Sequence, residues 1–114
     1  MSNLYHITSK GAANKISGNG YYYSETFSQE GFIHCSYRDQ LSGVAARYYA
    51  DKNDLVVMEI DPDKLDCEIL EENLTGATEL FPHLYGPIPK VAITAIYDFS
   101  GSTGELSERP DKGP

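Results

Sequence analysis

The stretch that decides the fold is GFIHCSYRDQLSGVAARYYADKNDLVVMEI, residues 31–60. Hydrophobicity alternates in 31–35 and predicts a short strand in which Phe32 and His34 share one face. The apolar run in 55–60 predicts a strand that is buried on both faces for most of its length. Residues 31–60 therefore form the one clear strand–helix–strand crossover of the chain.

The segment between these strands predicts an amphipathic helix over 37–50. Its apolar side chains recur at helical spacing and lie on one face: Leu41, Val44, Ala45, Tyr48 and Tyr49. Ser36, followed three residues later by Asp39, resembles a capping box and marks the start of the helix. Arg47 lies on the flank of the apolar stripe, where it can reach a phosphate group or pair with an acidic neighbour.

The same rules, applied outward along the chain, predict the remaining elements. We expect a strand over 3–8, a short helix over 10–17 capped by Ser9, a helical turn over 61–65 capped by Asp61, a weaker strand over 67–71 and a strand over 91–98. Residues 73–90, which are interrupted by prolines and glycines, predict an irregular loop. A single crossover among mostly consecutive strands predicts an α+β fold, in which a small bent or split β-sheet carries two main helices.

The 114 residues are expected to form one domain over residues 1–99. Leu106 is the only sizeable apolar residue after Ser100, so residues 100–114 are predicted to be a disordered tail. The formal net charge of −8 opposes binding to bulk nucleic acid and to anionic membranes, but it leaves room for one small ligand. No apolar run reaches the ~18 residues of a membrane span and no signal peptide is visible, so we expect a cytoplasmic protein, with a monomer as the default state.

Two histidines occupy similar positions in the predicted strands. His6 and His34 each lie in mid-strand, and a hydroxyl side chain follows two residues later, Thr8 and Ser36 respectively. The two-residue period of a strand puts each hydroxyl on the same face as its histidine. Two imidazoles and two hydroxyls on one sheet face are unlike a core face and indicate a binding site. Each histidine taken separately also fits a half-buried side chain with internal hydrogen bonds.

A third histidine lies in the segment FPHLYGP, residues 81–87. Prolines stiffen this loop, so it can line a pocket with His83 and Tyr85, or it can plug into the core with its apolar side chains. Glu71 and Glu72 precede the loop. A carboxylate beside histidines suits general-base chemistry or the stabilisation of a developing cation, and the alternative is a solvated acidic pair.

His6, His34 and His83 could also hold a catalytic zinc ion with water as the fourth ligand. No two of them have the HxH or HxxxH spacing that places two ligands on one element, and we expect no metal. Cys35 and Cys67 form no CxxC pair, and both thiols are expected to be reduced. Because Cys35 directly follows His34, the two side chains point to opposite faces, which predicts a core residue rather than a nucleophile.

Four motifs resemble those of DUF952, a family of small bacterial domains of unknown function: LYHIT at 4–8, EGFIHCS at 30–36, IDP at 60–62 and FPHLYGPI at 81–88. The resemblance covers residues 3–97. It implies the ADP-ribosyltransferase-like fold, a grouping that also includes the tRNA 2′-phosphotransferases. Proteins of that grouping bind NAD in a cleft between two small sheets.

The residues and the resemblance together select a candidate site. The expected catalytic residues are Glu72, His34 and His83, and the expected ligand-binding residues are His6, Thr8, Ser36, Arg47 and Tyr85. The resemblance implies that His6 holds the ribose or nicotinamide side of NAD. It also implies a carboxylate just before the FPHLYGPI motif, which is Glu72, with Glu71 as the competing assignment.

Three functions follow as expectations. The first is a site for a small nucleotide-type ligand, with NAD as substrate, that catalyses ADP-ribosyl transfer or a related phosphotransfer through an oxocarbenium-like state. The second is a noncatalytic nucleotide- or ligand-binding module that has the same pocket. The third is a zinc hydrolase built on the three histidines.

Overall fold

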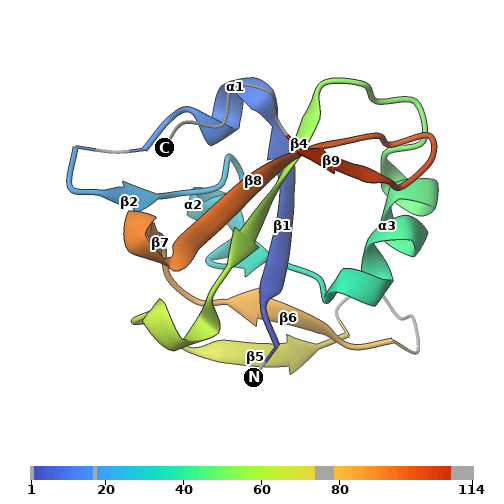
Figure 1. Cartoon of the computed structure of the whole chain (residues 1–114). Coiled ribbons are helices and arrows are strands. Elements are labelled where there is room, and N and C mark those ends of the chain that lie inside the picture. The colour runs from blue at the N-terminus through green and yellow to red at the C-terminus, as the bar shows by residue number, and fades with distance from the viewer. Residues whose placement is uncertain (1, 17, 74–78, 109–114) are drawn as a thin grey trace.

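The structure is a computed structural model that describes residues 2–16, 18–73 and 79–108, and these form an α+β domain of small antiparallel sheets and few helices (Figure 1). The strands are β1 (Leu4–Ser9), β2 (Tyr21–Tyr22), β3 (Ile33–His34), β4 (Leu55–Ile60), β5 (Ile69–Glu72), β6 (Phe81–Leu84), β7 (Ile88–Pro89), β8 (Ile93–Phe99) and β9 (Leu106–Glu108). The helices are α1 (Lys10–Ala13), α2 (Phe27–Glu30) and α3 (Leu41–Tyr48), with 3₁₀ turns at Arg38–Gln40, Pro62–Lys64 and Lys90–Ala92. The predicted α+β class is confirmed.

The largest sheet has the order β1-β4-β8-β9, so β4 lies between two neighbours. The side chains of β4 alternate between two cores. Val56, Met58 and Ile60 face the main core, and Leu55 and Val57 face a second core on the opposite side of the sheet. This two-sided burial confirms the strand predicted from the apolar run.

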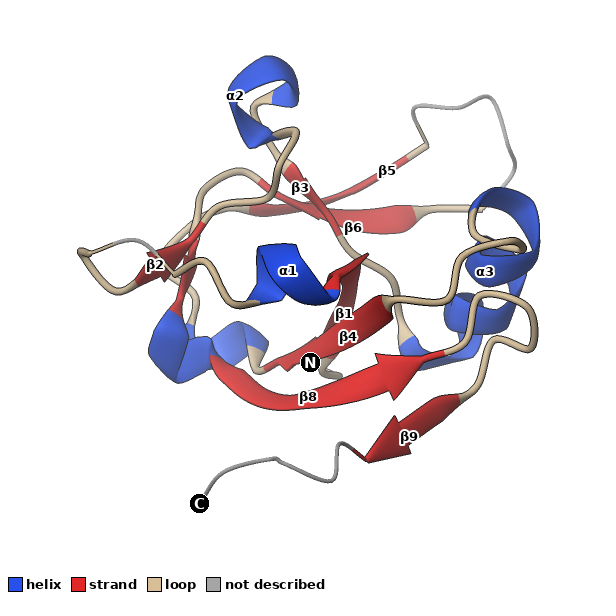
Figure 2. Cartoon of the chain, turned by 90° about the horizontal axis from the view of Figure 1, so that it is seen from above, coloured by secondary structure: helices blue, strands red, loops and turns tan. Residues whose placement is uncertain are grey.

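The other sheets have the orders β3-β6-β5 and β2-β7. Figure 2 shows the β3-β6-β5 sheet on one side of the molecule and the β1-β4-β8-β9 sheet on the other, with α3 near one end of both.

The irregular loop predicted over 73–90 contains two strands, β6 and β7, so the prediction is wrong at these residues. Pro82, His83 and Leu84 are all buried, so β6 shows no alternation. Pro82 has no backbone N–H to donate, but its carbonyl oxygen accepts a hydrogen bond from the N–H of Cys35 at 3.0 Å.

The helices are shorter than predicted. Ser9 caps α1 as expected, since its Oγ accepts the Ala12 N–H at 3.1 Å, but α1 spans only four residues. The capping box before α3 lies one residue later than predicted, with Gln40 Oε1 accepting the Tyr37 N–H at 2.9 Å. α2 was not predicted, because four residues are too few to show a helical period. Among the described residues, no helix is long and apolar enough to cross a membrane.

The segment after β8 belongs to the domain. β9 pairs antiparallel with β8, with Phe99 opposite Leu106, and Leu106 packs against the second core. The predicted disorder is therefore wrong for residues 100–108, and residues 109–114 lie outside the described residues. This segment is held by backbone pairing and by close contact with the end of α3, which hydropathy does not reveal.

Gly101 provides a test of that contact. A Cβ on Gly101 would clash with the carbonyl oxygen of Tyr49 and lie 2.9 Å from that of Lys52, and backbone atoms cannot rotate away. We expect Gly101→Ala to lower the free energy of unfolding by about 2 kcal/mol in urea denaturation. Gly11→Ala is the control, because a Cβ there meets no atom within 4 Å and alanine favours helix α1. Equal stability of the two variants would contradict the close contact.

Candidate functional site

Two histidines face each other across neighbouring strands. The antiparallel register of β3 and β6 pairs His34 directly with His83. Their ring centroids are 5.0 Å apart and the ring planes are nearly perpendicular, at 81°. The His34 side chain is 52% exposed, whereas that of His83 is 5% exposed. The pair therefore presents one solvent-accessible and one enclosed imidazole to the same region.

Glu72 holds the enclosed imidazole. The pairing of β5 with β6 brings Glu72 Oε1 to 2.9 Å from His83 Nδ1, and the Tyr85 hydroxyl donates to the same oxygen at 2.6 Å. The hydrogen bond from Tyr85, and after it the one from His83, keeps the pKa of Glu72 below its ordinary value. An ionised carboxylate only accepts hydrogen bonds, so His83 Nδ1 carries a proton, and in the neutral form of the ring Nε2 is an acceptor. This arrangement suits His83 as a general base.

Phe32 packs against three aromatic side chains of the site. Its ring stacks on His83 at 4.5 Å and 25°, meets His34 edge-on at 4.8 Å and lies 5.3 Å from Tyr85. These contacts restrict the planes of both imidazoles. Phe32 was not selected from the sequence, although the predicted strand placed it on the same face as His34.

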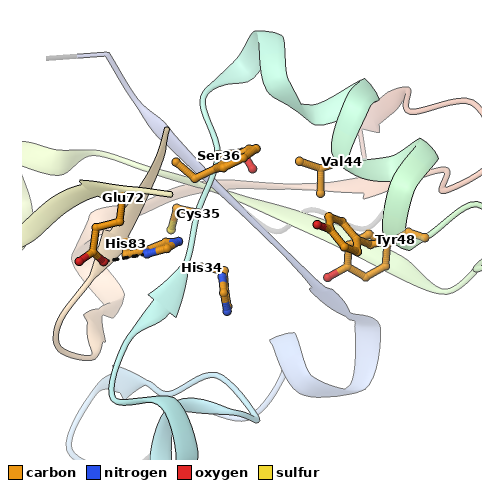
Figure 3. A pocket seen from close by; sticks show the side chains of 9 residues that line it. His34, Cys35, Ser36, Val44, Tyr48, Glu72 and His83 are labelled. Atoms are coloured by element: carbon orange, nitrogen blue, oxygen red, sulfur yellow. Dashed lines mark hydrogen bonds and ion pairs between the residues drawn. The ribbon is translucent and has the colours of Figure 1, made fainter. Parts of the chain in front are cut away.

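A cavity of about 360 Å³, the first cavity, lies between the β3-β6-β5 sheet and α3 (Figure 3). Its lining residues are His34, Cys35, Ser36, Val44, Tyr48, Tyr49, Glu72, Phe81 and His83. Figure 3 shows Glu72 and His83 on one side, and Val44 and Tyr48 of α3 on the other. The first cavity thus combines an acid–base pair with aromatic and apolar surface, and its volume suits a small organic molecule.

His6 does not line the first cavity with His34 and His83, because β1 belongs to a different sheet from β3. It lines a second cavity together with Thr8 and His34. Its ring is buried, with Nδ1 2.7 Å from the carbonyl oxygen of His34 and Nε2 3.0 Å from the hydroxyl of Tyr22, which is also 3.3 Å from Thr8 Oγ1. Burial lowers the pKa of His6 to about 4, despite the opposing effect of the bond to the His34 carbonyl. The neutral His6 ring therefore fixes the backbone of His34, because its Nδ1 donates a hydrogen bond to the His34 carbonyl.

The other predicted residues divide between the site and its surroundings. Ser36 is buried and lines the first cavity, and its backbone is tied to β1 by two hydrogen bonds with Tyr5, at 2.7 and 2.8 Å. Arg47 is absent from that lining among the described residues, and it pairs with Glu79 at 3.5 Å, the second alternative stated for it. Glu71 is exposed, so Glu72 is the carboxylate that meets the histidines.

The geometry does not assemble the three-histidine metal site. Both ring nitrogens of His6 are engaged by protein groups. Within the described part of the chain, no three His, Cys, Asp or Glu side chains are placed to share a metal ion. Cys35 is buried in the main core, and burial raises the pKa of its thiol, which confirms the prediction of a core residue.

Comparison with known proteins places these observations in a family. The model of the family described as "Protein of unknown function (DUF952)" matches residues 7–96. The X-ray structure of protein CC0527 from Caulobacter crescentus, a structural genomics target, is 25% identical with a TM-score of 0.73, and the match covers 93% of this chain and 94% of that chain. The solution NMR structure of CC0527 is 26% identical with a TM-score of 0.65, covering 88% and 86%. No curated protein matches the sequence.

Proposed function

Since the chain belongs to the DUF952 family of proteins of unknown function, we propose its function from the chemistry of its site: the first cavity binds a small nucleotide-type ligand, on which His83 and Glu72 perform acid–base catalysis. The observation that carries this proposal is the hydrogen bond of 2.9 Å between Glu72 and His83 beside the cavity. It orients the ring and leaves Nε2 as the base. A carboxylate that orients a histidine in this way is a recurring catalytic device.

NAD and ADP-ribose are the first ligands to consider. This choice rests on the resemblance of the sequence to proteins of the ADP-ribosyltransferase-like grouping. The aromatic lining from Tyr48 and Tyr49 suits a flat heterocyclic ring. Membership of the wider grouping is part of the proposal and follows from analogy of architecture.

The proposed reaction is cleavage of a glycosidic bond. In NAD the bond between ribose C1′ and the nicotinamide nitrogen breaks, and its electron pair leaves with nicotinamide. The oxygen of water or of another acceptor hydroxyl forms the new bond to C1′, and its proton passes to His83 Nε2. The ionised Glu72 stabilises the protonated imidazole and the developing oxocarbenium ion. His34, which is exposed at the rim of the first cavity, contacts the ligand.

We expect millimolar NAD to shift the side-chain NMR signals of His34 and His83. The measurement is a ¹H–¹⁵N spectrum of the imidazoles with and without ligand, with ADP-ribose in parallel and inositol as the unrelated polyol control. Release of free nicotinamide, followed by chromatography, distinguishes an enzyme from a noncatalytic binding module. Unshifted His34 and His83 signals with every ligand would contradict the proposal.

A further inference from the structure

A second cavity, of about 390 Å³, adjoins the first. His34 and Tyr49 line both, so the exposed imidazole stands at the boundary between them. A ligand seated against His34 in the first cavity can therefore extend past this side chain into the second without crossing the core.

The second cavity differs in chemistry from the first. Its lining includes four serine and threonine residues, three acidic residues, one lysine and two histidines: Thr8, Ser9, Ser24, Thr26, Glu25, Glu30, Asp54, Lys52, His6 and His34. The Ser24 hydroxyl oxygen is itself buried, and it has no hydrogen-bond partner among the described residues. Because this oxygen is buried, a ligand in the second cavity meets the exposed lining residues instead, among them Glu25, Thr26 and Glu30.

The charges of the lining select the ligand group. With three carboxylates against one ammonium, the second cavity disfavours a phosphate, which is repelled and receives few donors. Sugar hydroxyls, in contrast to phosphate, fit an acidic lining. They donate to carboxylates, as ribose hydroxyls do to acidic residues in dinucleotide-binding proteins, and they exchange hydrogen bonds with serine and threonine.

We propose that the second cavity is the pentose subsite of the ligand bound in the first cavity, so that the substrate class is an aromatic N-riboside recognised through its ring and its sugar hydroxyls and not through phosphate. The ring lies against Tyr48 and Tyr49, and the glycosidic bond lies near the two histidines. This inference rests on the proposed function, since it places the two halves of the same ligand. For NAD it assigns recognition to the nicotinamide riboside half.

The test compares nicotinamide riboside, nicotinamide mononucleotide and NAD by calorimetry. We expect their dissociation constants to agree within about threefold, because the phosphate contributes little. Glu25→Gln should weaken all three by roughly tenfold, the effect of losing one hydrogen bond to a charged group, and should leave binding of free nicotinamide unchanged. Glu25 is the residue to change because Glu30 bonds His34 directly. Asp51→Asn, which also removes one exposed negative charge but lies outside both linings, is the matched control.

Two results would overturn the inference in different ways. If NAD binds a hundredfold more tightly than the riboside and Glu25→Gln has no effect, the second cavity is not the pentose subsite, and the proposed function is unaffected. If none of the three ligands binds the wild-type protein, and nicotinamide does not bind either, the proposed function itself is wrong. Thermal unfolding of Glu25→Gln verifies that the variant is folded in either case.

Discussion

Glu72→Gln is expected to lower the rate of nicotinamide release from NAD by roughly 10²-fold or more. Glutamine keeps the shape of the side chain but has no charge to stabilise the protonated His83 ring. Its amide can also donate to His83 Nδ1, which would move the imidazole proton to Nε2 and abolish the base. The measurement is the initial rate at saturating NAD, with the dissociation constant determined separately.

Glu71→Gln is the matched control for this experiment. The two glutamates are adjacent, but Glu71 is exposed, whereas Glu72 is the one bonded to His83. We expect Glu71→Gln to retain the wild-type rate within about twofold, as a surface substitution normally does. Equal losses in the two variants would mean that the rate responds to general negative charge, and the role assigned to Glu72 would be wrong.

The free energy of unfolding is expected to decrease steeply as the pH is lowered, because His6 is buried in its neutral form. An unfolded histidine titrates near pH ~6.5, but in the folded protein burial lowers the pKa of His6 to about 4. Between these values the unfolded chain takes up a proton that the folded chain does not. The stabilisation is therefore fully present above pH ~6.5 and is lost as the pH falls toward 4, by roughly 3 kcal/mol in total.

Urea denaturation between pH 6.5 and 5 isolates this effect, because carboxylates with a lowered pKa act mainly at more acidic values. His6→Gln should remove most of the pH dependence in this interval, since glutamine can donate to the His34 carbonyl and accept from Tyr22 without titrating. His34→Gln, at the exposed rim, should retain it. A wild-type protein whose stability is unchanged from pH 6.5 to 5 would contradict a buried, neutral His6.

Much of the candidate site was visible in the sequence. The strand that carries His34 was recognised, and the motif around His83 identified a histidine and a tyrosine near a carboxylate. The sequence left Glu71 and Glu72 as alternatives, since both precede that motif. The structure separates them, because the pairing of β5 with β6 directs only Glu72 to His83.

The assignment of His6 shows where the reasoning from strand periods failed. The two-residue period places His6 and Thr8 on one face of β1, and both line the second cavity. The period holds no information about which strand comes next to β1. β1 pairs with β4, and an isolated bridge between Tyr5 and Ser36 links it to the segment after β3. His6 therefore meets the backbone of His34 and not its ring.

By itself the sequence determined local features of this protein: the doubly buried strand β4, the caps at Ser9 and Asp61, and the buried positions Leu41 and Ala45 of α3, whereas Tyr48 of the predicted apolar stripe is exposed. These depend on neighbours within a few residues, which periodicity and capping preferences describe. Only the tertiary structure decided that β6 is a strand, that residues 106–108 join the sheet and that His34 lies opposite His83. Those features depend on hydrogen bonds between segments distant in sequence, and each backbone group can form such bonds with any strand that the whole fold brings beside it.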